Sequence, residues 1–137
     1  MNATSRRRLA ALAAMAATIA LGLASRHWVG ALPDALGKYP GDALWATMVV
    51  VGWCALRPRA RLREIAALAA LTCLVVEVAK LWRAPWLVAF RQTTIGHLLL
   101  GQVFSWRNLV AYGLGVLAGV ALARLLPDAG SPTMRHA

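Results

Sequence analysis

The residues of this sequence that could do chemistry are charged side chains set inside long apolar runs. Asp42, Glu77 and Lys80 are the clearest examples. On insertion scales an ionised side chain costs about 2.5–3.5 kcal/mol at the centre of a membrane helix, so one that is kept there usually serves a function. Glu77 and Lys80 are three residues apart, which places them on one face of a helix.

Other polar residues are candidates for the same site, and they complete a set of carboxylates, cations and hydrogen-bonding groups. They are Arg26, Arg91, His97, Asn108 and Tyr112. We expect Arg26, Lys80 and Arg91 to hold a phosphate or carboxylate, with Asn108 and Tyr112, four residues apart, on one helix face beside them.

Asp42 and Glu77 are the candidate catalytic residues, and they would orient the cations or act as acid and base. His97 is a candidate proton shuttle, although a lone His beside Gly and Leu is more often a packed, hydrogen-bonded residue. Known catalytic patterns are missing: the sequence has no Ser-His-Asp order, no zinc-binding His-Glu-x-x-His and no glycine-rich phosphate loop. Cys54 and Cys73 make neither a disulfide framework nor a zinc site. We therefore expect no metal and no cofactor, favour binding over bond cleavage, and leave enzymatic activity open.

The composition indicates a single domain that is embedded in a membrane. The 137 residues are 60% apolar and 15% charged, with a mean hydropathy of +0.60 and a net charge of +10. Soluble domains are about half apolar and a quarter charged. This composition excludes intrinsic disorder and argues against a soluble protein that binds nucleic acid. We predict an all-α membrane protein.

A membrane-spanning helix needs about 20 mostly apolar residues. The sequence predicts a four-transmembrane-helix bundle within residues 1–127, with spans at about 9–25, 42–58, 63–82 and 107–126. Residues 84–106 contain polar residues and glycines, so we predict a re-entrant or interfacial segment between helices 3 and 4. A fifth span is the alternative. We expect a disordered cytoplasmic tail at 128–137.

Basic clusters at Arg6–Arg8 and Arg57–Arg63 predict the orientation. The positive-inside rule places both clusters, and hence both termini, in the cytoplasm, and it places the candidate site in the outer half of the membrane. A cleaved signal peptide is the alternative for the first span, but its apolar run is longer than a signal peptide requires.

Small residues in the last span predict close helix packing. Gly115 and Gly119 form a Gly-x-x-x-Gly pair, a spacing that lets helices approach closely. We expect packing within the bundle first, with a homo-oligomer through Gly115 and Gly119 as the alternative.

Several stretches together resemble one family: Gly41–Trp45, Glu77-x-x-Lys80, Arg91–Thr93 and Phe104–Gly113. The sequence is similar to the bacterial domain-of-unknown-function family numbered 2809, whose members in turn resemble VanZ-like membrane proteins. The resemblance implies a protein of the bacterial cytoplasmic membrane and the cell envelope, and it brings no established reaction. This chain departs from the pattern twice, with Lys80 in place of the usual Gln and Asn108 in place of the usual Asp.

The sequence thus favours a small protein that binds or processes an anionic lipid or cell-envelope amphiphile in the outer leaflet. Its expected partners are membrane lipids and that amphiphile, with no nucleic acid. Two alternatives stay open: an oligomeric transporter of a small solute or ion, and a non-catalytic scaffold or partner subunit.

Overall fold

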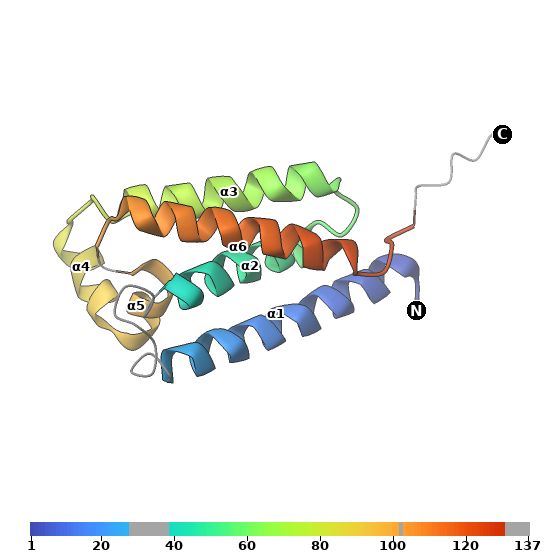
Figure 1. Ribbon diagram of the computed structural model, residues 1–137, viewed down its shortest axis with the longest axis horizontal. Coiled ribbons are helices and arrows are strands. Elements are labelled where there is room, and N and C mark those ends of the chain that lie inside the picture. Colours follow the sequence, from blue (N-terminus) through green and yellow to red (C-terminus); the bar gives the residue numbers. More distant parts are fainter. Residues whose placement is uncertain (28–38, 102, 131–137) are drawn as a thin grey trace.

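The structure is a computed structural model that describes residues 1–27, 39–101 and 103–130. Within these residues the chain forms six helices and no strand (Figure 1). The helices are α1 (Ala3–His27), α2 (Tyr39–Leu56), α3 (Leu62–Ala79), α4 (Pro85–Gln92), α5 (Thr94–Leu100) and α6 (Trp106–Arg124). The prediction of an all-α protein is confirmed for the described residues.

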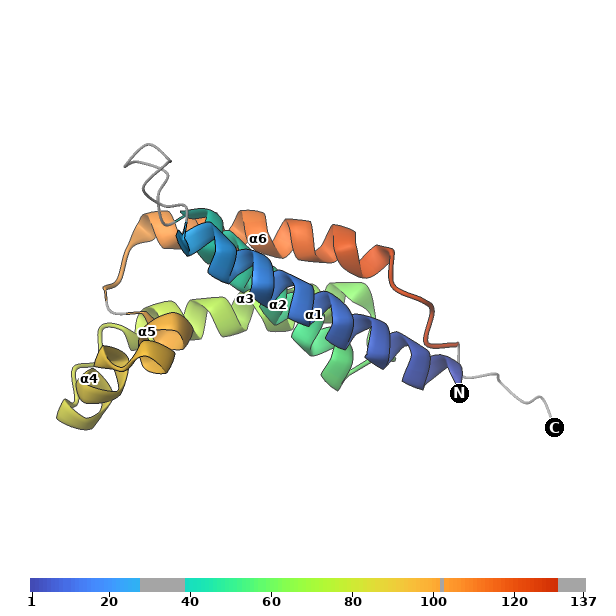
Figure 2. The same ribbon diagram turned by 90° about the horizontal axis from the view of Figure 1, so that it is seen from below.

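Four long helices run along the length of the molecule, and the two short helices lie together at one end (Figures 1 and 2). Helix α2 is central, because it packs against α1, α3 and α6, and α6 also packs against α3. We call one end the α4–α5 end. The opposite end is the basic end, where α1 begins, α2 is linked to α3 and α6 finishes. Its arginines are Arg6–Arg8, Arg57, Arg59, Arg61, Arg63 and Arg124.

Residues 84–106 form two short helices because the sequence there carries several helix boundaries. Pro85 begins α4, where its missing N–H costs nothing. The Thr93 side chain caps α5 by accepting a hydrogen bond from the Gly96 N–H, and Ser105 caps α6 in the same way. Helices of 8 and 7 residues reach only about 12 Å at 1.5 Å per residue, far short of a membrane core. Neither helix alone is long enough for the fifth span that was the alternative.

Small side chains make up much of the core, together with Val50, Val51 and Ile65, and many large apolar side chains lie on the outside. Ala11, Ala46, Ala69 and Cys54 are fully buried. Leucines and valines on α3 and α6 are exposed instead, including Leu71, Leu74, Val75, Leu114 and Leu117. Bundles that pack in lipid use small residues at their interfaces in this way.

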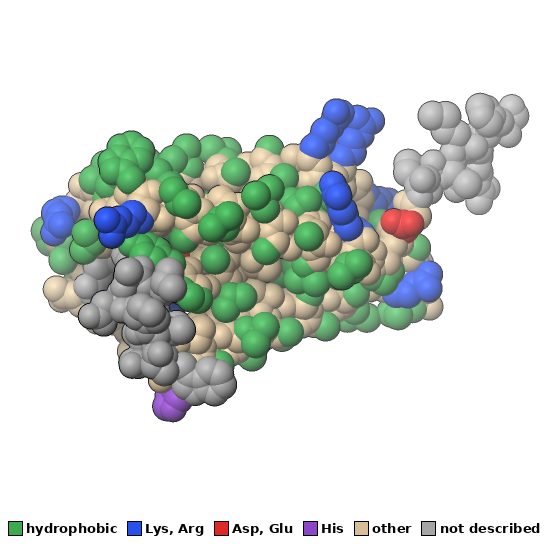
Figure 3. All heavy atoms as spheres, viewed as in Figure 1, with side chains coloured by type: hydrophobic (Ala, Val, Ile, Leu, Met, Phe, Trp, Pro, Cys, Tyr) green, Lys and Arg blue, Asp and Glu red, His purple; other side chains and the backbone are tan. Residues whose placement is uncertain are grey.

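Length and composition alone allow two of the described helices, α1 and α6, to cross a membrane. Helices α2 and α3 have 18 residues each, and they contain the charged residues Asp42, Arg63, Glu64 and Glu77. On the face shown in Figure 3, Lys and Arg side chains gather at the two ends, and a mostly uncharged band lies between them.

The start of the predicted tail lies against α1. The Thr4 hydroxyl donates to the carbonyl of Ala129 at 3.3 Å, and Arg7 Nη1 donates to that of Pro127 at 2.9 Å. Residues 131–137 lie outside the described residues, so their disorder stays a prediction.

Gly115 and Gly119 bring the backbones of α2 and α6 together. A Cβ on Gly115 would lie 2.1 Å from the Ala43 carbonyl oxygen, and one on Gly119 would lie 2.7 Å from Val50 Cβ. Both glycines therefore serve packing within one chain, as we expected first. An oligomer through the same face would have to displace α2, and the contacts within one chain do not test whether copies associate.

We expect Gly115→Ala to lower the free energy of unfolding by about 1–3 kcal/mol, because the added methyl group forces α2 and α6 apart. The matched control is Gly113→Ala on the same helix, where an added Cβ meets nothing within 4 Å. That variant should be neutral, or more stable by about 0.5–1 kcal/mol through helix propensity. Chemical denaturation in detergent measures both, and equal stability of the two variants would contradict the close approach.

Candidate functional site

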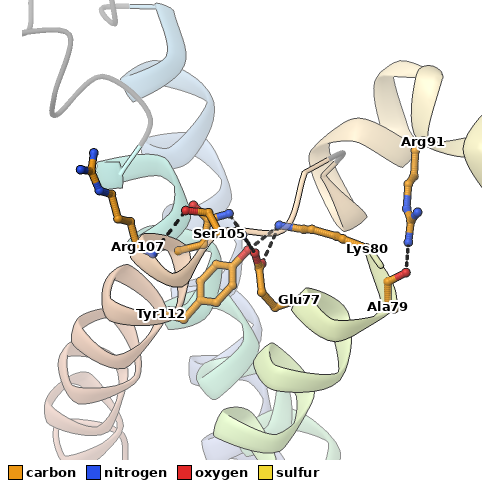
Figure 4. A network of polar contacts seen from close by, with 8 residues as sticks. Glu77, Ala79, Lys80, Arg91, Ser105, Arg107 and Tyr112 are labelled. Carbon is orange, nitrogen blue, oxygen red and sulfur yellow. Dashed lines mark hydrogen bonds and ion pairs between the residues drawn. The ribbon is translucent and has the colours of Figure 1, made fainter. Parts of the chain in front are cut away.

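Glu77 is the centre of a buried polar cluster at the α4–α5 end. Its side chain is 0% exposed. One carboxylate oxygen, Oε1, accepts hydrogen bonds from the Ser105 backbone N–H at 2.8 Å and from Asn108 Nδ2 at 3.2 Å. The other, Oε2, accepts one from Lys80 Nζ at 2.6 Å (Figure 4). Three donors thus replace the water that burial removes.

Lys80 lies just past the last residue of α3 and is 4% exposed. Besides its ion pair with Glu77, the ammonium group donates to the Tyr112 hydroxyl at 3.4 Å. Gly101 makes room for it, because a Cβ there would lie 2.9 Å from Lys80 Cε. Gly101 also has a φ of 65°, in the left-handed region that favours glycine.

We call Glu77, Lys80, Asn108 and Tyr112 the Glu77 cluster. The cluster unites four of the eight candidate residues from the sequence, and it joins the end of α3 to the start of α6. The Ser105 amide, which sequence reasoning missed, is its fifth member by contact. The sequence does contain a signal for this contact, because a serine directly before an apolar helix is typical of a helix cap.

Lys80 and Asn108 complement each other around the Glu77 carboxylate. Asn108 donates its amide to Glu77, whereas an Asp there would face the same carboxylate with a second negative charge. Lys80 gives Glu77 a cation where a Gln would give a neutral donor. In this chain the buried carboxylate is therefore matched by one cation and one amide.

Asp42 lies beside the cluster, in the first turn of α2. It precedes Trp45 by three residues, so the two share a helix face. The Trp45 ring packs against the Tyr112 ring with the centroids 5.4 Å apart. The second carboxylate is thus near the Glu77 cluster.

Arg91 contacts the end of α3 and, contrary to our expectation, does not join Lys80 in one anion-binding site. It is 3% exposed, and its guanidinium donates to the carbonyl oxygens of Trp82, at 2.8 Å, and Ala79. Figure 4 shows this side chain reaching the end of α3 and not the Glu77 carboxylate. A cation at the last carbonyls of a helix is favourable, so Arg91 fixes α4 against α3.

Arg26 and His97 are exposed, unlike the buried members of the Glu77 cluster. Arg26 is at the end of α1, where its Nε lies 3.8 Å from the point that a Cβ on Gly41 would occupy. His97 lies on the short helix α5.

An apolar groove opens between α1, α2 and α5, and we call it the α1–α5 groove. It encloses about 240 Å³. Its walls include Gly22, Leu23, Leu44, Met48, Leu98 and Leu99, and Arg26 and Trp45 also line it. Trp45 lines this groove and also packs against Tyr112, so its indole ring connects the groove with the Glu77 cluster. Sequence reasoning missed this groove.

The described residues contain no group of three His, Cys, Asp or Glu side chains placed to hold a metal ion. Cys54 and Cys73 are buried free thiols in α2 and α3.

Sequence comparison now places the chain among known proteins. The profile of the family described as "Protein of unknown function (DUF2809)" matches residues 31–116, which is more than half of the chain. The chain belongs to the DUF2809 family. The matched region contains Asp42, Arg91, His97 and the Glu77 cluster, but not Arg26 or α1. No solved structure matches this DUF2809 chain.

We expect Glu77→Ala to lower the free energy of unfolding by about 3–5 kcal/mol, because it leaves the buried Lys80 ammonium without its carboxylate. Glu64→Ala is the matched control, since Glu64 is an exposed carboxylate on the same helix, and its effect should stay within about 0.5 kcal/mol. Denaturation in detergent measures both.

A double variant separates the cost of leaving the Lys80 charge unpaired from the other effects of changing Glu77. Glu77→Gln keeps an oxygen that can accept from Ser105 and Asn108, and Lys80→Met then removes the unpaired cation. The double variant should recover at least half of the stability that Glu77→Gln alone loses. No recovery would show that the Lys80 charge is not what Glu77 compensates.

Proposed function

We propose that this DUF2809 protein is a multi-pass membrane protein that binds an anionic amphiphile at its α4–α5 end. The observation that carries the proposal is the α1–α5 groove, whose walls are apolar and which also carries the exposed cation Arg26. An acyl chain would lie between α1, α2 and α5, and an acidic headgroup would lie against Arg26.

The groove and the arginine contribute differently to such binding. Within a bilayer an acyl chain is already surrounded by hydrocarbon, so transfer into the groove gains packing and little hydrophobic free energy. Selection must therefore come from the headgroup, where a guanidinium pairs with a phosphate or carboxylate through two parallel hydrogen bonds. Neutral lipids lack that contribution, so the expected ligand is anionic.

The Glu77 cluster stabilises one wall of the α1–α5 groove. It fixes the start of α6, and Tyr112 in turn holds the Trp45 ring that forms part of the groove wall. Because the Glu77 carboxylate is fully buried against three donors, we propose binding and not bond cleavage as the activity. Asp42, Glu77 and Lys80 then act as positioning residues.

The proposed membrane arrangement has four spans, α1, α2, α3 and α6, with α4 and α5 as the re-entrant or interfacial segment. The shorter spans, with 18 residues each, reach about 27 Å, close to the thickness of the hydrocarbon core. Exposed tryptophans at the α4–α5 end, Trp82, Trp86 and Trp106, are typical of a membrane interface. The arginines of the basic end favour a cytoplasmic location for that end, with both termini inside a bacterial cytoplasmic membrane.

A structural scaffold is the second candidate. One observation favours it: the three hydrogen bonds to the Glu77 carboxylate described above all come from within the chain itself. A scaffold needs the cluster for stability but has no use for the α1–α5 groove, so blocking the groove separates the two functions.

We expect Gly22→Phe to block the groove, because a Cβ at this position meets only Leu44 Cβ, at 3.9 Å, and the ring would extend between the walls. The probe is phosphatidylglycerol with a photoreactive acyl chain, held in phosphatidylcholine nanodiscs with the purified chain. Labelling of α2 and α5 should fall several-fold in Gly22→Phe. Gly113→Phe, on an open part of α6, is the control and should label like the unchanged chain.

Arg26→Gln tests the headgroup contact in the same assay. Because one arginine near an anionic surface contributes about 1 kcal/mol, the preference for the phosphatidylglycerol probe over its phosphatidylcholine counterpart should fall about five-fold. Unchanged labelling in Gly22→Phe would favour the scaffold.

A cysteine-accessibility experiment tests the orientation. In a Cys54→Ala, Cys73→Ala background, Arg107→Cys at the α4–α5 end should react with an impermeant thiol reagent added to intact cells. Arg61→Cys at the basic end should react only after the membrane is permeabilised. Both replaced arginines are exposed, so burial does not mask the difference. The reverse pattern would contradict the outward location of the site.

A further inference from the structure

A large cleft at the basic end brings together segments that are far apart in the sequence. The start of α1, the link between α2 and α3, and the chain that follows α6 all contribute to it. The cleft encloses about 950 Å³ and is lined by Arg7, Arg59, Arg61 and Arg124. We call it the basic cleft. It lies at the opposite end of the bundle from the α1–α5 groove.

Internal contacts hold two of these arginines in place. Arg7 Nη1 donates to the Pro127 carbonyl at 2.9 Å, and Arg59 Nε donates to the Thr4 hydroxyl at 3.1 Å. The Thr4 hydroxyl in turn donates to the Ala129 carbonyl at 3.3 Å. A guanidinium has five N–H donors, so these contacts leave donors on both side chains for a ligand. The cleft is therefore partly preorganised.

The charge in the cleft is unbalanced. Asp128 is the one carboxylate among the residues described as lining it, against four arginines. Four guanidinium groups around one cleft repel each other and raise the local concentration of anions. Guanidinium groups match phosphate in geometry as well as in charge, because each can donate two parallel hydrogen bonds to it.

We propose that the basic cleft binds the phosphate groups of an anionic lipid headgroup. The cleft lies where the long helices end, which is the depth at which the headgroups of one leaflet would lie around a membrane-spanning bundle. Basic pockets between such helices bind phosphorylated headgroups. Its volume exceeds the need of a single phosphate, and its arginines come from three separate segments, so a headgroup with two phosphates matches it best. The proposal rests on the proposed membrane location but not on the α1–α5 groove.

Two pairs of arginines from one loop make the test selective. Arg59 and Arg61 line the cleft, whereas Arg57 and Arg63 are exposed and are not among the lining residues. Changing either pair to Gln removes the same charge from the same link between α2 and α3. The purified full chain is titrated with diphosphatidylglycerol and with phosphatidylglycerol in phosphatidylcholine nanodiscs, and binding is followed by native mass spectrometry.

We expect the Arg59→Gln, Arg61→Gln variant to bind diphosphatidylglycerol about thirty-fold more weakly than the unchanged chain. The Arg57→Gln, Arg63→Gln variant should stay within two-fold of it. Arg124→Gln is a second test on another segment, and its exposed side chain can be changed if loss of the Arg59 contact to Thr4 impairs folding. It should weaken binding about five-fold.

Two results would overturn the proposal. Equal losses in the two double variants would show that lipid senses only the overall positive charge of this end. Binding of free pyrophosphate as tight as that of the bilayer lipid would assign the cleft to a soluble phosphate compound. Failure of the α1–α5 groove experiments would leave the basic cleft unaffected, because its variants and its ligand are separate.

Discussion

The buried carboxylate of Glu77 is the constraint on which the α4–α5 end of the molecule depends. A carboxylate with no exposed surface is stable only when donors surround it, and here they come from three places: the end of α3, the residue that caps α6, and the first turn of α6. Lys80 in turn needs the space that Gly101 leaves open. One buried charge thus fixes the meeting point of α3, α6 and the segment that joins them.

The two ends of the bundle differ in how far their charged side chains are exposed. At the α4–α5 end, Glu77, Lys80 and Arg91 are withdrawn from solvent and satisfied by partners inside the chain. At the basic end Arg59, Arg61 and Arg124 stay exposed around an open cleft, and Arg7 is half-buried there. Between the ends, small residues let α2 and α6 approach to backbone contact. Close helix packing is therefore concentrated in the middle of the molecule, and most of the charged side chains lie at its two ends.

The spacing of residues along the sequence predicted which side chains share one helix face. It did not predict contacts with backbone atoms or a groove formed between helices. Glu77 with Lys80, and Asn108 with Tyr112, could be paired from separations of three and four residues, and the four side chains do meet. Arg91 could not be placed, because its partners are backbone carbonyls, which every sequence contains. The α1–α5 groove could not be predicted for a related reason. Its walls come from three helices, and the periodicity of a sequence does not determine the distance between helices.

The attachment of α4 and α5 has a mechanical consequence. These helices pack mainly against each other, and Arg91 joins α4 to the last carbonyls at the end of α3. The α4–α5 pair is joined to the long helices at two places, by Arg91 at the end of α3 and by Gly101, beside Lys80, at the end of α5, and α5 forms one wall of the groove. A displacement of α5 that widens the groove would therefore load both the Arg91 contacts and the packing of Lys80 against Gly101.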